Sequence, residues 1–276
     1  MVGIVILNYN NSAQTLGCLE SLYKHCKGGN WKVCLVDNAS DREELEKLRK
    51  GCNEHIIVAT GNKGYACGND LGCEWFDKDP EVDKILILND DTRFTEDIIT
   101  PLEAYLDCHP ECGVVFPLVV APDGSMDKAC ARKQKSTADL VLQATCLGKL
   151  GIRRKEFIDR EEIADADKVV TAVPPGSCMM LPKELFKEIG WLDPHTFLYF
   201  EEHILGRKLA DRNRQCVLLP KTSIIHLGAS TTSKQPSKAV YMHWRNSYLY
   251  YMEKYTDIPC AVRRWLEFRT WLKTLI

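Results

Sequence analysis

The chain has 276 residues, 45% of them hydrophobic and 27% charged, which is typical of a soluble globular protein with one large domain or two small ones. A formal net charge of -2 argues against a nucleic-acid binder that depends on an overall basic surface. No stretch reaches the roughly 18 apolar residues that a membrane span needs, and we expect no signal peptide. The 13 cysteines are scattered, odd in number and without a CxxC pair, so we expect reduced thiols in a cytoplasmic protein.

The first part of the chain alternates short apolar runs with helical patterns. Residues 2–7, 31–36, 55–58 and 85–88 are rich in β-branched residues and predict buried strands. Helical patterns follow over residues 12–24, 41–50 and 95–108, the last with Thr95 as its expected cap. Alternation at such close intervals predicts βαβ units and a parallel sheet.

Polar residues follow each of these four predicted strands. They are residues 8–12, 37–41, a loop over 61–72 with four glycines, and Asn89-Asp90-Asp91. Open α/β sheets bind ligands at the carboxyl ends of their strands, and carboxylates there suit a divalent cation with a phosphorylated ligand. The alternative for Asn89-Asp90-Asp91 is an ordinary solvated turn.

The pattern weakens in the middle of the chain and then returns. A strand over residues 112–120 is interrupted by Pro117, and residues 121–168 are interpreted as an insertion over the sheet. Further strands are predicted at 169–173, 178–181, 216–219 and 223–225, with helices opened by Pro182, over 201–211, over 238–255 and from Pro259.

Together these segments resemble the family 2 glycosyltransferases of the GT-A fold, and most closely their rhamnosyltransferase- and galactofuranosyltransferase-like branch. The stretches that carry the resemblance are VILNYN (5–10), VDNAS (36–40), GNKGYA (61–66), NDD (89–91), GWLD (190–193), FLYFEE (197–202) and HLGAS (226–230). They occur in the family's order and spacing over residues 2–255.

The resemblance implies an α/β GT-A domain over residues 1–235, with a mostly parallel central sheet flanked by helices. Residues 1–120 would be its Rossmann-like nucleotide-sugar-binding half, 121–168 the insertion, and 169–235 the catalytic and acceptor half. Residues 236–276 would form a C-terminal helical extension.

The resemblance also implies a function. The protein would move a sugar, with inversion, from a UDP- or dTDP-sugar to a hydroxyl of a glycan or polyprenyl-linked glycan in cell-surface polysaccharide synthesis. Mg²⁺ or Mn²⁺ would be bound by Asp91 and His226. Expected donor contacts are Leu7, Asn8, Tyr9, Asp37, Asn38, Asn62, Gly64, Asn69, Asn89, Asp90 and Arg245, and expected acceptor contacts are Gly176, Trp191 and Asp193.

Glu201 and Glu202 match the family's Glu-Asp pair, whose second acid is the general base, so Glu202 is the expected base and Glu201 the alternative. Glu in place of Asp moves the carboxylate by roughly 1.5 Å, and Asn89 in place of an acid lowers the charge around the metal by one. Simpler roles stay open: acids at a helix start complement its dipole, His226 can be purely structural, and Arg245 can join two parts of the fold.

Residues 259–276 combine basic and apolar residues, including Trp265 and Trp271, near helical spacing. Such a helix suits contact with an anionic membrane surface, which would place the protein on the inner face of the membrane; docking on its own domain or in a homodimer is the alternative. Two rival functions are a sugar nucleotidyltransferase, which would need a glycine-rich basic loop at residues 8–12, and a catalytically weak homologue that binds nucleotide sugar or glycan.

Overall fold

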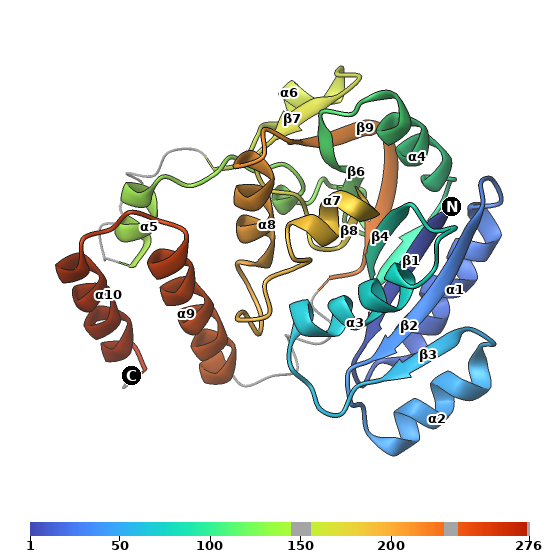
Figure 1. The fold of residues 1–276 in the computed structure, drawn as a ribbon, viewed down its shortest axis with the longest axis horizontal. Coiled ribbons are helices and arrows are strands. Elements are labelled where there is room, and N and C mark those ends of the chain that lie inside the picture. The colour runs from blue at the N-terminus through green and yellow to red at the C-terminus, as the bar shows by residue number, and fades with distance from the viewer. Residues whose placement is uncertain (145–155, 229–236, 275–276) are drawn as a thin grey trace.

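The computed structural model describes residues 1–144, 156–228 and 237–274. Figure 1 shows a central sheet flanked by helices, with α9 and α10 at the opposite end of the molecule from α1 and α2. The strands are β1 (Val2–Asn8), β2 (Trp31–Asp37), β3 (His55–Val58), β4 (Lys84–Asn89), β5 (Thr92–Phe94), β6 (Cys112–Val120), β7 (Val169–Thr171), β8 (Cys178–Pro182) and β9 (Gln215–His226). The helices are α1 (Ser12–His25), α2 (Arg42–Gly51), α3 (Tyr65–Asp77), α4 (Ile99–Cys108), α5 (Thr137–Ala144), α6 (Arg160–Ala164), α7 (Lys183–Glu188), α8 (Glu201–Ala210), α9 (Ser237–Lys254) and α10 (Cys260–Leu272).

The strand order is β3-β2-β1-β4-β8-β6-β9-β5, and β7 pairs with β9. The first four strands are parallel, with Asn8 opposite Asp37 and Leu7 opposite Asn89. β8 runs antiparallel between β4 and β6, so β6 and β9 point the same way as β1 and β4. The mostly parallel α/β sheet of the sequence analysis is confirmed, and the carboxyl ends of β1, β2, β4 and β9 lie at one edge.

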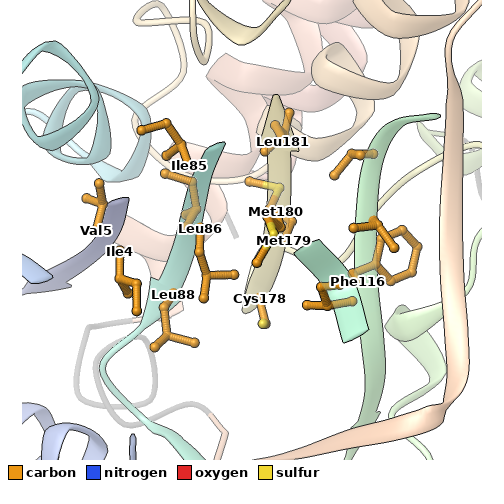
Figure 2. Close-up of a cluster of buried hydrophobic side chains, with 14 of the residues drawn as sticks. Ile4, Val5, Ile85, Leu86, Leu88, Phe116, Cys178, Met179, Met180 and Leu181 are labelled. Atoms are coloured by element: carbon orange, nitrogen blue, oxygen red, sulfur yellow. The ribbon is translucent and has the colours of Figure 1, made fainter. Parts of the chain in front are cut away.

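The inner strands are buried on both faces, as their continuous apolar runs predicted. Figure 2 shows Ile4 and Val5 of β1 on one side of Leu86 of β4, with Met179 and Met180 of β8 on the other side of β4. Helix α3 approaches this sheet closely because it carries glycine at the contact: a Cβ on Gly72 would lie 2.5 Å from Val5. The sheet is therefore a rigid base for the loops at its carboxyl edge.

The strand expected at 169–173 ends at Thr171, and two other predictions differ more from the structure. The helix expected from Thr95 begins at Ile99, with Ile98 at its N-cap position, and the Asp97 carboxylate just before it accepts the N–H of Ile99 at 3.0 Å, which is one of the backbone groups that a helix start leaves unpaired. The two short strands expected at 216–219 and 223–225 are one strand, β9. It stays paired with β6 through a register shift after Pro117, which absorbs the irregularity that suggested a break.

The C-terminal helices share a second hydrophobic cluster with the insertion and α8. Its buried members are Leu140, Phe200, Ile204, Tyr248, Tyr251, Met252 and Leu266. The hydroxyl of Tyr248 also donates to the Leu140 carbonyl at 2.9 Å. Part of the predicted insertion, residues 145–155, lies outside the described residues. No helix that the structure describes has the length and apolarity to cross a bilayer.

Gly64 joins the first half of the fold to the segment before α8. Its φ is +94°, and a Cβ there would lie 2.2 Å from the Phe197 carbonyl oxygen. We expect Gly64→Ala to lower the free energy of unfolding by about 2–4 kcal/mol, from backbone strain and overpacking together. Gly61→Ala is the matched control, because a Cβ at Gly61 meets nothing within 4 Å. Urea denaturation measures both, and equal stability of the two variants would contradict the prediction.

Candidate active site

The ends of β1 and β2 form a polar floor at the carboxyl edge of the sheet. Asn8 Nδ2 donates to Asp37 Oδ1 at 2.7 Å, and the Ser40 backbone N–H donates to the other Asp37 oxygen at 3.0 Å. The Thr15 hydroxyl donates to Asn8 Oδ1 at 2.9 Å. Asn8 and Asp37 are fully buried, and Tyr9 is half-buried beside them. Asn8 and Asp37, two of the predicted contacts to the nucleotide sugar, are therefore held in place before any ligand binds.

The glycine-rich loop closes over this floor through amide side chains. Asn38 Nδ2 donates to Asn62 Oδ1 at 3.0 Å and to the Gly64 carbonyl at 3.1 Å, while Asn62 Oδ1 also accepts the Gly64 N–H. Asn69 Nδ2 donates to the Tyr65 carbonyl at 2.9 Å. The Asn69 Oδ1 atom is buried and has no hydrogen-bond partner among the described residues, and the role of Asn69 in donor binding stays a prediction. Leu7 packs against Gly68 under this loop.

The predicted metal ligands Asp91 and His226 lie together. Asp91 Oδ1 is 3.1 Å from His226 Nε2, and Thr92 is paired with His226 across β5 and β9. On the other side, His226 Nδ1 lies 3.7 Å from Asp127 Oδ2. Burial lowers the pKa of His226, but the two carboxylates outweigh it and raise that pKa to about 9.

Asp127 is a site residue that sequence reasoning missed. It precedes the short 3₁₀ turn at Lys128–Cys130 and accepts the Ala129 N–H. Its contact with His226 lowers the pKa of the Asp127 carboxyl. The signal in the sequence was too weak to find it, because Asp127 lies in a stretch without periodic pattern and meets His226 only through the long-range pairing of β6 with β9.

Asp90 lies beside Asp91 but has a different environment. Burial and the neighbouring Asp91 charge raise the pKa of Asp90 to about 7. Asn11 Nδ2 donates to Asp90 Oδ2 at 3.1 Å, and the Asn89 N–H donates to the Ser177 carbonyl at 2.9 Å. Two buried acids side by side favour a cation close to them.

The residues at this point fit a divalent metal ion. Asp91 Oδ1 is buried and makes no hydrogen bond within the described part of the chain, although His226 is near it. A carboxylate oxygen suits Mg²⁺ or Mn²⁺, and the imidazole nitrogen beside it is a ligand that first-row transition metals accept more readily than Mg²⁺ does. No cluster of three or more His, Cys, Asp or Glu side chains arranged to hold a metal occurs among residues 1–144, 156–228 and 237–274. The remaining coordination positions would therefore come from substrate and water.

Glu201 and Glu202 begin α8 after a strained turn. Tyr199 and Phe200 have φ of +74° and +72°, values that cost energy for non-glycine residues and cluster at functional sites. Glu201 is buried, its Oε1 has no partner among the described residues, and burial together with the Glu202 charge raises its pKa well above the ordinary range. Glu202 is less buried: its Oε1 lies against Gly176, where a Cβ would be 2.6 Å away, and 3.9 Å from Arg132 Nη2.

One short loop joins the metal motif to these acids. The Ser177 carbonyl accepts the Asn89 N–H at 2.9 Å, and the Gly176 carbonyl accepts the Tyr65 hydroxyl at 2.5 Å. Because Gly176 also touches Glu202, the segment 174–177 contacts both Asn89 and Glu202. The structure thus brings Asp91, His226, Gly176 and Glu202 to one region of the carboxyl edge.

Three other predicted contacts have different surroundings. The Asp193 carboxylate accepts hydrogen bonds from the hydroxyls of Tyr250 at 3.0 Å and Tyr255 at 2.5 Å. Arg245 Nε donates to Thr270 Oγ1 at 3.1 Å, which matches the structural alternative for this arginine. Trp191 packs edge-on against Phe186. The donor role of Arg245 and the acceptor roles of Trp191 and Asp193 stay predictions.

Trp191 also lines a cavity of about 450 Å³ between α3, the end of β3 and residues 190–194. Asp70, Leu71 and Glu74 of α3 line it too. At 100° per residue they lie on the side of α3 that faces away from Tyr65 and the acids. This cavity is therefore separate from the region around Glu202.

The family model described as Glycosyl transferase family 2 matches residues 3–190. The N-acetylglucosaminyl-diphospho-decaprenol L-rhamnosyltransferase of Mycobacterium tuberculosis is 24% identical over 247 residues, which cover 84% of this chain and 78% of that protein. The dTDP-rhamnosyl transferase RfbF of Shigella flexneri is 23% identical over 194 residues, or 70% of this chain and 58% of that protein. The structure of GalNAc-T7 with UDP, GalNAc and Mn²⁺ has a similar fold, with a TM-score of 0.65 at 14% identity over 98% of this chain and 55% of that one.

Asp70 makes stability depend on pH. Burial raises the pKa of Asp70 to about 8, whereas an aspartate in an unfolded chain titrates near about 3.9. The folded state therefore holds an extra proton between about pH 4 and 8, and the free energy of unfolding falls as pH rises through that window. Asp70→Asn cannot ionise at this position. We therefore expect its free energy of unfolding, relative to that of the wild type, to rise by about 1–3 kcal/mol from pH 5 to pH 7.5.

Urea denaturation at the two pH values measures this difference. Glu20→Gln, which removes an exposed carboxylate on α1, is the control and should show no such gain. A constant difference between Asp70→Asn and the wild type at both pH values would show that Asp70 ionises normally in the folded protein.

Proposed function

Because the chain belongs to glycosyl transferase family 2, we propose that it transfers a sugar, with inversion, from a UDP- or dTDP-sugar to a hydroxyl of a lipid-linked glycan. The observation that carries this proposal is that Asp91 lies beside His226, while the segment 174–177 contacts both Asn89 of the same motif and Glu202. Asp91 and His226 suit a cation that binds a diphosphate, and Glu202 suits proton transfer from an acceptor hydroxyl.

The names of the relatives support the substrate classes. One is a rhamnosyltransferase that acts on a diphospho-decaprenol-linked sugar, and another is named for dTDP-rhamnose. The neighbouring structure contains UDP and Mn²⁺. On the donor side of this chain, Asp37 and Asn8 lie buried beside the half-buried ring of Tyr9, which suits a pyrimidine base. A donor with UDP or dTDP and an acceptor carried by a polyprenol fit these relatives.

Asp91 and His226 would hold Mg²⁺ or Mn²⁺, which supplies positive charge for the nucleoside diphosphate as it leaves. Asp127 would orient the His226 ring from its Nδ1 side, as a carboxylate commonly does for a ligating histidine. Asp90, held by Asn11, would face the ribose and sugar of the donor. Asn89 stands where the family has an acid, and its backbone N–H donates to the Ser177 carbonyl. The motif still supplies two carboxylates, those of Asp90 and Asp91.

Glu202 would be the general base and Glu201 would not. Burial keeps Glu201 protonated near neutral pH, since its pKa is raised, whereas Glu202 is partly exposed at the segment 174–177. The acceptor oxygen forms a bond to the anomeric carbon while the bond from that carbon to the diphosphate breaks. The hydroxyl proton moves to the Glu202 carboxylate, and the diphosphate leaves with the electron pair.

Transfer and donor hydrolysis test this assignment, with dTDP-rhamnose, UDP-GlcNAc and UDP-GalNAc as donors and Mn²⁺ present. We expect Glu202→Gln to lower kcat by about 10²–10⁴-fold, because it removes the base, and to leave nucleotide binding intact. Asp91→Asn should weaken Mn²⁺-dependent nucleotide binding as well as turnover. Glu184→Gln, an exposed acid on α7, is the control. Equal rates for all variants would favour a homologue that binds nucleotide sugar without turnover.

We also propose that α10 contacts the inner face of the membrane, where a polyprenol-linked acceptor would lie. Its outer face exposes Trp265, Phe268 and Trp271 by 43%, 57% and 46%. Arg264 is exposed beside Trp265, and the opposite face buries Leu266 and Thr270. The face of α10 that packs on the rest of the protein is therefore not the face that carries the exposed aromatic residues. Aromatic rings with basic residues suit the interface of an anionic bilayer.

Co-sedimentation with phosphatidylglycerol and phosphatidylcholine vesicles measures this contact. We expect binding to the anionic vesicles, and a loss of at least about tenfold when Trp265, Phe268 and Trp271 are all changed to alanine. A Tyr23→Ala, Val58→Ala double variant, which removes exposed apolar groups elsewhere, is the control. If the triple variant binds vesicles normally but dissociates a dimer in sedimentation, the face belongs to a homodimer instead.

A further inference from the structure

Arg132 lies beside the proposed base, although the sequence analysis did not identify it as a site residue. Its backbone is fixed against the segment that leads to Gly176: the Arg132 carbonyl accepts the N–H groups of Ala172 at 2.9 Å and Val173 at 3.2 Å. The side chain is only 11% exposed. A long side chain in a buried position with its backbone held at two points has little freedom to move away.

The guanidinium has few partners for a buried cation. Nη2 donates to the Pro174 carbonyl at 2.9 Å and lies 3.9 Å from Glu202 Oε1. The Nε atom is buried without a hydrogen-bond partner in the described part of the chain. Arginine carries five N–H donors, so this group keeps donors for an anion at the place where Glu202 lies.

Three titratable neighbours of Glu202 on α3 and α8 are neutral near pH 7, and the charged Glu156 and Lys135 beyond His203 pair with each other at 3.1 Å. Tyr65 of α3 has its pKa raised by burial and by the two glutamates. Glu201 has its pKa raised by burial, and His203 has its pKa lowered by burial. Among these described neighbours, Arg132 is the residue with a permanent positive charge.

We propose that Arg132 is the positioning residue of Glu202, holding its carboxylate against Gly176 and placing a permanent positive charge beside it during proton abstraction. The proposal rests on the proposed role of Glu202 as general base. Arg132 reaches the acid from the insertion, and it touches the same loop, through Pro174, that carries Gly176. The insertion therefore contributes to the acid's environment from outside α8.

The pH dependence of kcat/KM for transfer, measured with Mn²⁺ on the wild type, Arg132→Gln and Arg132→Lys, tests this role. Loss of a positive charge about 4 Å away makes ionisation harder, so the acidic limb of the Arg132→Gln profile should move up by about one pH unit. Its kcat should fall about 10–100-fold, and Arg132→Lys should keep the limb in place with a smaller loss. Arg212→Gln, an exposed arginine paired with Glu188 near the end of α8, is the control.

Calorimetry measures binding of the nucleoside diphosphate, either UDP or dTDP according to which the wild type binds, in the presence of Mn²⁺. It separates a role for Arg132 in positioning Glu202 from a role in binding the diphosphate. The proposal expects unchanged affinity at each pH, which also shows that the groups around Asp91 titrate as before. An unmoved limb in both Arg132 variants overturns it, as does a more than tenfold loss of nucleotide affinity, which would mean that Arg132 contacts the diphosphate. Full activity of Glu202→Gln would instead refute the proposed base, so the two failures are distinguishable.

Discussion

The register of the parallel strands is the constraint on which the site depends. Asn8 pairs with Asp37, and Leu7 pairs with Asn89, so the polar residues that follow β1, β2 and β4 emerge at one edge. A slip of one residue in any of these strands would move every side chain to the opposite face, and because both faces are closely packed each side chain would meet a space shaped for a different one. The buried apolar runs therefore set the register, and the register in turn sets which acids meet. Neighbouring groups offset the cost of burying these acids: Asn8 donates to Asp37, and Asn11 donates to Asp90.

Contacts from α3 and from the C-terminal helix α9 support the segment that leads to the acids of α8. The Tyr65 N–H donates to the Phe197 carbonyl at 2.9 Å from α3, and the Ser247 hydroxyl donates to the Leu198 carbonyl at 2.9 Å from α9. These contacts hold the segment whose last two residues have positive φ, and such strain persists only where surrounding structure over-determines it. Helix α9 thus helps to place Glu201, although the sequence analysis set residues 236–276 apart as an extension.

Local patterns carry information about elements, and long-range pairing decides most of the rest. The strands at the carboxyl edge and the acids after them could be predicted, because apolar runs and turn residues are local signals. The contact of Asp91 with His226 was expected only from the resemblance to a family. Asp127 and Arg132 could not be predicted, since they lie in a stretch without periodicity and reach the site through the pairing of β6 with β9 and the backbone contacts at residues 172–174. Arg245 is the opposite case. It matches a family motif, but its guanidinium donates hydrogen bonds to α10.

Adjacent carboxylates at a helix start need different surroundings if they are to have different roles. Glu201 and Glu202 are neighbours, so full ionisation of both would place two negative charges close together near an apolar core. Burial selects Glu201 as the acid that keeps its proton, and its Oε1 has no partner among the described residues that would favour the charged form. Neutral Glu201 then adds no charge next to Glu202, while Arg132 adds a positive one from the other side. The proposed base therefore depends on two groups outside the reaction itself, one that stays neutral and one that stays charged.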